Sequence, residues 1–117
     1  MKGSVEVELR GGIIVATYTG EMDVELVKEA AASIENYLHT TDSSKILYNT
    51  LEMANPPMKL ALEMKAFDTK IKQQVTKSAT VVPGATTAFM ASIAFVLSKN
   101  HKVFYNDPEG AITWLNS

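Results

Sequence analysis

The chain has no cysteine and almost no excess of charge of either sign, and both shortages exclude classes of function. Without cysteine there are no disulfides, no thiolate metal ligands and no thiol nucleophile. The 11 basic and 13 acidic side chains nearly cancel. We therefore expect no nucleic-acid partner, because such partners are held mainly by neutralising their phosphates. No uncharged run is long enough to cross a membrane, so no membrane span is expected.

The N-terminal segment also lacks the apolar core of a signal peptide. Residues 1–6 lead instead into alternating charged and apolar side chains, so we expect a cytoplasmic protein. A length of 117 residues is that of one ordinary domain, with enough buried surface to need no disulfide or metal. The prediction is a single domain over residues 1–117.

Residues that carry chemistry are few, and each has a structural explanation. His39 and His101 have no acidic or histidine partner at metal-ligand spacing, so a helix-end role and a surface role are expected for them. Gly84 stands alone after a predicted strand, without the further glycines of a phosphate-binding loop. The carboxylates Glu21 and Asp23 suit the start of a helix. The sequence therefore predicts no enzyme, no metal site and no cofactor.

A strand hairpin is predicted at the N-terminal end. Apolar residues at 5, 7 and 9 alternate with charged residues at 6, 8 and 10, which is the pattern of a strand with one buried face. Gly11 and Gly12 then supply a two-residue turn, because glycine enters positive-φ conformations without strain. The apolar run 13–19 forms the second strand, so the pair is antiparallel.

Beyond the hairpin, helical spacing alternates with short apolar runs. Helices are expected near 24–38, 58–75, from about 87, and over 108–115, with strands at 45–50, 79–82 and 102–105. Strands separated by helices pair in parallel through right-handed crossovers. The prediction is an α/β fold with a five-stranded mixed sheet, an N-terminal antiparallel hairpin and about four helices.

Residues 78–98 contain no charged side chain, and their pattern predicts a strand, a turn and a helix. A surface helix of a small domain normally carries charge on its outer face, so this face is expected to be covered. Phe95 lies there among small residues, and the predicted contact surface consists of Met90, Ala91, Phe95 and Ser98. The cover could be the C-terminal helix with Trp114, a protein partner or an apolar ligand.

Four segments resemble the SpoIIAA-like proteins of the STAS superfamily. They are Phe67–Ile71, Ala79–Pro83, His101–Phe104 and Ala111–Leu115. The resemblance implies a non-enzymatic sensing or protein-interaction module, and relatives with the Sec14-type lipid-binding fold add a small apolar ligand such as a lipid as an alternative. We expect a self-associating regulatory module, a homodimer, that can also bind a regulatory protein partner.

Anti-sigma-factor antagonists of the superfamily carry a phosphorylatable serine directly after the strand that here covers residues 45–50. This chain departs from that pattern, because residues 49–53 contain no serine and Thr50 is their only hydroxyl. The similar letters Asp42-Ser43-Ser44 precede the strand. The phosphorylation switch is therefore not carried over, and Thr50 is kept as the candidate phosphoacceptor.

Overall fold

The computed structural model describes residues 3–54, 58–84 and 100–117, in which five strands form one mixed sheet with helices on both faces. The sheet order is β1-β2-β3-β4-β5, so each strand pairs with the strand before it in the chain. The elements are β1 (Ser4–Arg10), β2 (Ile13–Gly20), α1 (Val24–Thr40), β3 (Lys45–Met53), α2 (Met58–Ile71), a 3-10 turn (Lys72–Gln74), β4 (Lys77–Val82), β5 (His101–Tyr105) and α4 (Pro108–Leu115).

Among the strand pairs in the described residues, only β1 and β2 are antiparallel. The hairpin turns at Gly11 and Gly12, which have φ angles of 53° and 80°, and these are the left-handed conformations that a two-residue hairpin turn requires. From β2 to β5 the neighbouring strands are parallel. The predicted mixed sheet with an N-terminal hairpin is confirmed.

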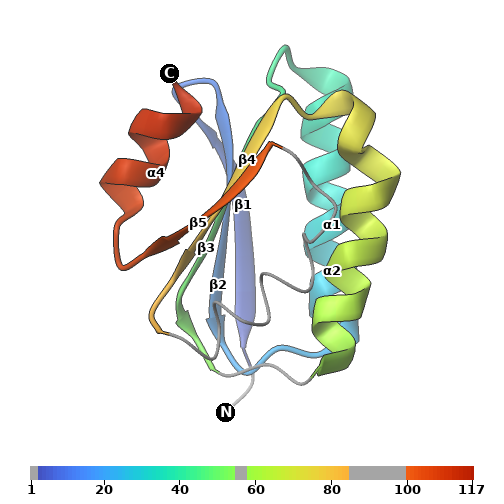
Figure 1. Cartoon of the computed structure of the whole chain (residues 1–117). Helices are drawn as coiled ribbons and strands as arrows, with labels where there is room; N and C mark the ends of the chain where they lie inside the picture. The colour runs from blue at the N-terminus through green and yellow to red at the C-terminus, as the bar shows by residue number, and fades with distance from the viewer. Residues whose placement is uncertain (1–2, 55–57, 85–99) are drawn as a thin grey trace.

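The helices divide the interior into two apolar layers. In Figure 1, α1 and α2 lie side by side on one face of the sheet, and α4 lies on the other. The buried side chains of the first layer are Ile14, Ala16, Tyr18, Ala30, Ile34, Ile46, Tyr48, Ala61 and Ile71. Those of the second are Ile13, Val15, Leu47, Ala79, Val81, Ala111 and Leu115. Because side chains alternate along a strand, β2 and β3 supply both layers.

Two aspartates begin the helices on opposite faces. The side chain of Asp23 accepts a hydrogen bond from the Leu26 amide at 2.8 Å, and that of Asp107 accepts one from the Gly110 amide at 2.9 Å. Each bond satisfies an amide that has no partner within its own helix. The helix start predicted at Asp23 is confirmed, and the helix predicted over 108–115 begins after Asp107.

Lys77 holds the end of α4 against the sheet. Its Nζ donates to the main-chain oxygens of Trp114 at 3.1 Å and Ser117 at 2.8 Å, and to the Ser117 hydroxyl at 2.9 Å. It also lies 5.1 Å from the centre of the Trp114 ring. A cation at the negative end of the helix dipole stabilises that helix, so Lys77 fixes the C-terminal end of α4.

The ends of two elements differ clearly from the prediction. The strand expected to end at Thr50 continues to Met53, because β3 still pairs with β2 beyond that residue. The helix expected to reach Val75 ends at Ile71, after which the chain tightens into the 3-10 turn. The helix predicted from about Thr87 lies outside the described residues.

Candidate functional site

The contact surface predicted from the sequence cannot be placed on this fold. Met90, Ala91, Phe95 and Ser98 all lie outside the described residues. The assignment of these four residues to a contact surface therefore stays a prediction. The remaining candidates, Thr50 and the two histidines, are described.

Thr50 lies inside β3 with its side chain turned into the protein. Its exposed fraction is 5%, and its hydroxyl donates to the Val81 carbonyl at 2.7 Å. The paired register of β3 with β4 ends one residue earlier, at Asn49 and Val81. The side chain of Thr50 thus continues the contact between these strands where their regular pairing stops.

His101 does not have the surface role expected from the sequence. Its Nδ1 lies 2.6 Å from the Ser78 hydroxyl, and its Nε2 lies 3.0 Å from the Thr80 hydroxyl. The parallel register explains the error, because it sets Ser78 directly beside His101, and Thr80 two residues further along β4. A sequence separation of 23 residues hid the contact.

Burial makes this histidine a poor acid or base catalyst. Removal from water lowers the pKa of His101 to about 3, so the ring is neutral near pH 7. A neutral imidazole has one donor and one acceptor nitrogen, which suits a place between two hydroxyls. Since a general base works best with a pKa near the working pH, a structural role suits the Ser78, Thr80 and His101 cluster better than catalysis.

Two tyrosines lie deep in the layer under α1 and α2. Tyr18 is 2% and Tyr48 0% exposed. Burial raises the pKa of both phenols, and the neighbouring Tyr18 and Asp68 raise that of Tyr48 further. Both phenols therefore stay protonated near pH 7.

The part of the chain that the structure describes holds no cluster of three histidine, aspartate or glutamate side chains placed to bind a metal ion. Within the same ranges, no helix has both the length and the apolar character needed to cross a bilayer.

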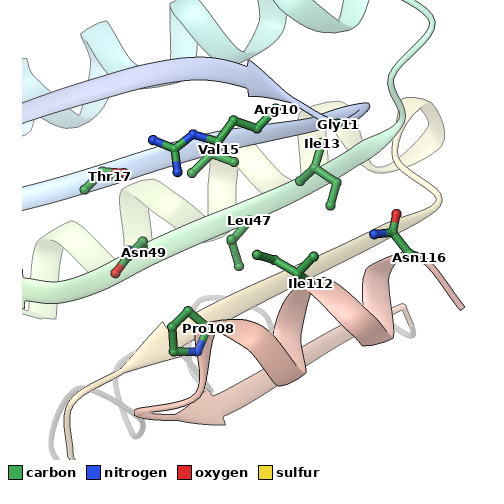
Figure 2. A pocket seen from close by; sticks show the side chains of 10 residues that line it. All are labelled: Arg10, Gly11, Ile13, Val15, Thr17, Leu47, Asn49, Pro108, Ile112 and Asn116. Carbon is green, nitrogen blue, oxygen red and sulfur yellow. The ribbon is translucent and has the colours of Figure 1, made fainter.

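A groove of about 300 Å³ opens on the other face of the sheet, between the hairpin and α4. Figure 2 shows the side chains of β2 and β3 on its floor, with Arg10 on the β1 side and Pro108 and Ile112 on the α4 side. Its full lining is Arg10, Gly11, Ile13, Val15, Thr17, Leu47, Asn49, Pro108, Ile112 and Asn116.

Strand register assembles the floor of this groove. Val15 of β2 lies beside Leu47 of β3, and Thr17 lies beside Asn49. The floor is therefore apolar at Val15 and Leu47, and polar at Thr17 and Asn49, which lie nearer the carboxyl ends of β2 and β3. Residues 13–17 are apolar on both faces of the strand, so no alternation in the sequence indicated which of them share the groove, and nothing in it placed α4 over that face.

Polar side chains at the groove are rich in donors. Arg10 pairs with Glu8 of the same strand, and both are partly exposed, with 71% and 45% of their side chains accessible. The Oδ1 of Asn49 accepts from the Leu51 amide at 3.1 Å, and the two N–H donors of Asn49 take no part in that bond. Guanidinium and amide donors favour a ligand that carries acceptors.

The fold as a whole resembles those of several solved structures. No protein-family model matches the chain, and no curated protein matches it. An anti-sigma factor antagonist from Mycobacterium paratuberculosis matches with a TM-score of 0.76 and 16% identity, over 99% of this chain and 96% of its own. The chain has a SpoIIAA-like fold.

Two further structures support the same conclusion. An uncharacterized protein of the DUF3478 family from Shewanella loihica PV-4, described as SpoIIAA-like, matches with a TM-score of 0.69 and 14% identity, over 97% of this chain and 93% of its own. The anti-sigma factor antagonist SpoIIAA in its unphosphorylated form matches with a TM-score of 0.67 and 15% identity, over 97% and 99%. At these identities the likeness concerns the fold, and it confirms the SpoIIAA-like architecture expected from the sequence.

Proposed function

We propose that this SpoIIAA-like chain is a non-enzymatic regulatory module that acts by binding protein. The observation that carries the proposal is the match over 99% of the chain to an anti-sigma factor antagonist, a protein whose description names a protein target. The environment of His101 supports the non-enzymatic part of the proposal, because a buried, neutral ring between two hydroxyls is poorly suited to acid or base catalysis.

The partner that we propose is a second copy of this chain, contacted through the predicted surface at Met90, Ala91, Phe95 and Ser98. The support is the uncharged sequence of residues 78–98. Interfaces between identical subunits favour aromatic and methionine side chains and exclude charge from their centre. Phe95 and Met90 are the aromatic and methionine side chains of this surface.

Light scattering after size-exclusion chromatography, over a range of protein concentrations, tests this proposal. We expect a dimer that Phe95→Asp converts to a monomer, because the substitution places a charge in the contact. The matched control is Leu62→Asp on α2, where the replaced side chain is 53% exposed. That variant should keep the dimer mass.

A second substitution separates loss of the contact from loss of folding. Ser98→Arg adds a charge to the same surface without removing an apolar side chain, and circular dichroism checks that each variant is folded. A wild-type monomer at all concentrations, or a dimer that survives both folded variants, would show that this surface does not mediate self-association.

A second candidate function is favoured by the groove between the hairpin and α4. A concave site with an apolar floor and a few polar side chains is typical of small-molecule binding, so the chain would be a carrier or sensor of a small apolar ligand. Native mass spectrometry of freshly purified protein tests this function. An added mass that disappears under denaturing conditions would support it, and a bare chain would count against a ligand that is retained through purification.

Phosphorylation of Thr50 is a separate hypothesis. Because the hydroxyl is buried and donates to the Val81 carbonyl, a kinase would reach it only after the end of β3 separates from β4. Mass analysis of the protein from its native host tests the hypothesis. Stoichiometric phosphate on Thr50 would support it, and an unmodified Thr50 peptide would oppose it.

A further inference from the structure

We propose that the groove between the hairpin and α4 binds a small carboxylic acid with an apolar body. The carboxylate pairs with Arg10, and the apolar body lies on the β2 and β3 floor against Ile112. This site is on the opposite face of the sheet from α1 and α2, and it rests on the second candidate function, small-ligand binding in this groove, and not on self-association.

The size of the groove limits the ligand to a short molecule. Its volume of about 300 Å³ is at the lower end of the range for ligand sites, about 300–1,000 Å³. Since one water occupies about 30 Å³ of liquid, the groove holds the equivalent of about ten waters. A fatty acid of about eight carbons has a comparable number of non-hydrogen atoms, whereas a membrane phospholipid is several times larger.

The apolar part of the site consists of a fixed floor and an open wall. Val15 and Leu47 on the floor are only 6% and 3% exposed, so they are held in place by the fold. Ile112 on α4 is 40% exposed, although its neighbour Ala111 is completely buried. A ligand that lies along α4 covers this exposed isoleucine, and burial of apolar area contributes about 25 cal/mol per Å².

Arg10 gives the site its preference for an anionic end. Its pairing with Glu8 is solvent-exposed, and exposed pairs of this kind contribute only about 0–1 kcal/mol. A guanidinium has five N–H donors, so Arg10 can keep Glu8 and still donate to a ligand. Its fork of donors matches the two oxygens of a carboxylate.

The acidic residues of β1 favour a carboxylate over a phosphate. In the hairpin register Glu6 lies opposite Thr17 and Glu8 lies opposite Val15, so both acids share the groove face with Arg10. A phosphate monoester carries up to two negative charges near pH 7 and is repelled more strongly by these acids. A ligand with a single negative charge is repelled less by the two glutamates and can still pair with Arg10.

Octanoate is the probe that we would use, in a titration followed by amide resonances in ¹⁵N NMR spectra of the full chain. We expect saturable shifts at Val15, Leu47 and Ile112. Acetate, which lacks the apolar body, and 1-octanol, which lacks the charge, should each bind more weakly. Phenyl phosphate is the comparison for a phosphate head group.

Arg10→Gln tests the charged contact. We expect it to weaken octanoate binding by about tenfold, which corresponds to the loss of one hydrogen bond to a charged group, and to leave octanol binding unchanged. Lys70→Gln is the matched control, because it removes one exposed cation from α2 on the other face of the sheet. Ile112→Thr should weaken octanoate and octanol binding together.

Three results would overturn the proposal. Octanol could bind as tightly as octanoate, Arg10→Gln could leave octanoate affinity unchanged, or the shifts could fall on residues 78–98 instead of the groove. The oligomeric mass of Arg10→Gln reports separately on the proposed function, so failure of this site and failure of self-association are distinguishable.

Discussion

Replacement of Thr50 by valine measures how strongly one buried hydroxyl ties β3 to β4. The two side chains have nearly the same shape, so the change removes the 2.7 Å hydrogen bond to the Val81 carbonyl and little else. At 5% exposure, water does not replace the lost donor. A buried neutral hydrogen bond contributes about 1 kcal/mol, and loss of its donor adds a desolvation cost for the acceptor. We expect the free energy of unfolding to fall by about 2 kcal/mol.

Thr69→Val is a matched control for this substitution. The Thr69 hydroxyl also donates to a main-chain carbonyl, that of Lys65 at 2.9 Å, but in an exposed part of α2. Water can replace that bond, and threonine and valine have similar helix propensities. Its cost should stay below about 0.5 kcal/mol.

Urea unfolding is the assay, followed both by fluorescence of Trp114, the only tryptophan of the chain, and by circular dichroism. The slope of the transition should be the same in all three proteins, so that the shift in midpoint gives the change in stability. Equal losses in Thr50→Val and Thr69→Val would refute the argument that burial makes the Thr50 bond important.

Three further predictions concern other parts of the fold. Lys77→Met should lower the free energy of unfolding by about 1–2 kcal/mol, because its Nζ binds main-chain oxygens at the end of α4. Lys70→Met removes a lysine that is 66% exposed and pairs with Glu35, so it should cost less than about 0.5 kcal/mol in the same urea assay. Equal costs of the two substitutions would contradict the prediction. Folding lowers the pKa of His101 from 6.5 to about 3, so between these pH values the unfolded chain binds more protons than the folded chain. The free energy of unfolding should therefore decline below pH 6.5 by up to about 1.4 kcal/mol per pH unit. An equally steep decline in His101→Gln would show that other groups cause the pH dependence. Gly12→Ala should lower the free energy of unfolding by about 1 kcal/mol, because φ is 80° at this residue. Gly84→Ala is the control, since an added Cβ there meets no atom within 4 Å, and a thermal melt should show a smaller effect for it.

Much of the fold could be predicted from local patterns. Alternation and the two glycines specify the hairpin, and Asp23 and Asp107 mark helix starts through side-chain bonds to amides three residues ahead. These signals involve neighbours in the chain, so a sequence displays them directly. The end of β3 was predicted too early because pairing with β2, a long-range contact, carries that strand on to Met53.

The site was harder to predict for the same physical reason. Arg10, Val15 and Leu47 meet Ile112 at the groove only because strand register and the docking of α4 bring distant residues together. The environment of His101 likewise depends on register with β4. Residue types indicated which side chains could carry chemistry, but the positions of their neighbours had to come from the structure.

The agreement between strand order and chain order has a consequence for synthesis. Each strand pairs with the one immediately before it in the chain, so every strand that leaves the ribosome finds its neighbour already made. After the hairpin has formed, none of the described strands β3, β4 and β5 waits for a partner that has still to be translated. The sheet can therefore grow in one direction, starting from the hairpin, with the shortest strand, β5, added last. Vectorial assembly of this kind limits the time for which an unpaired inner edge is exposed to other nascent chains.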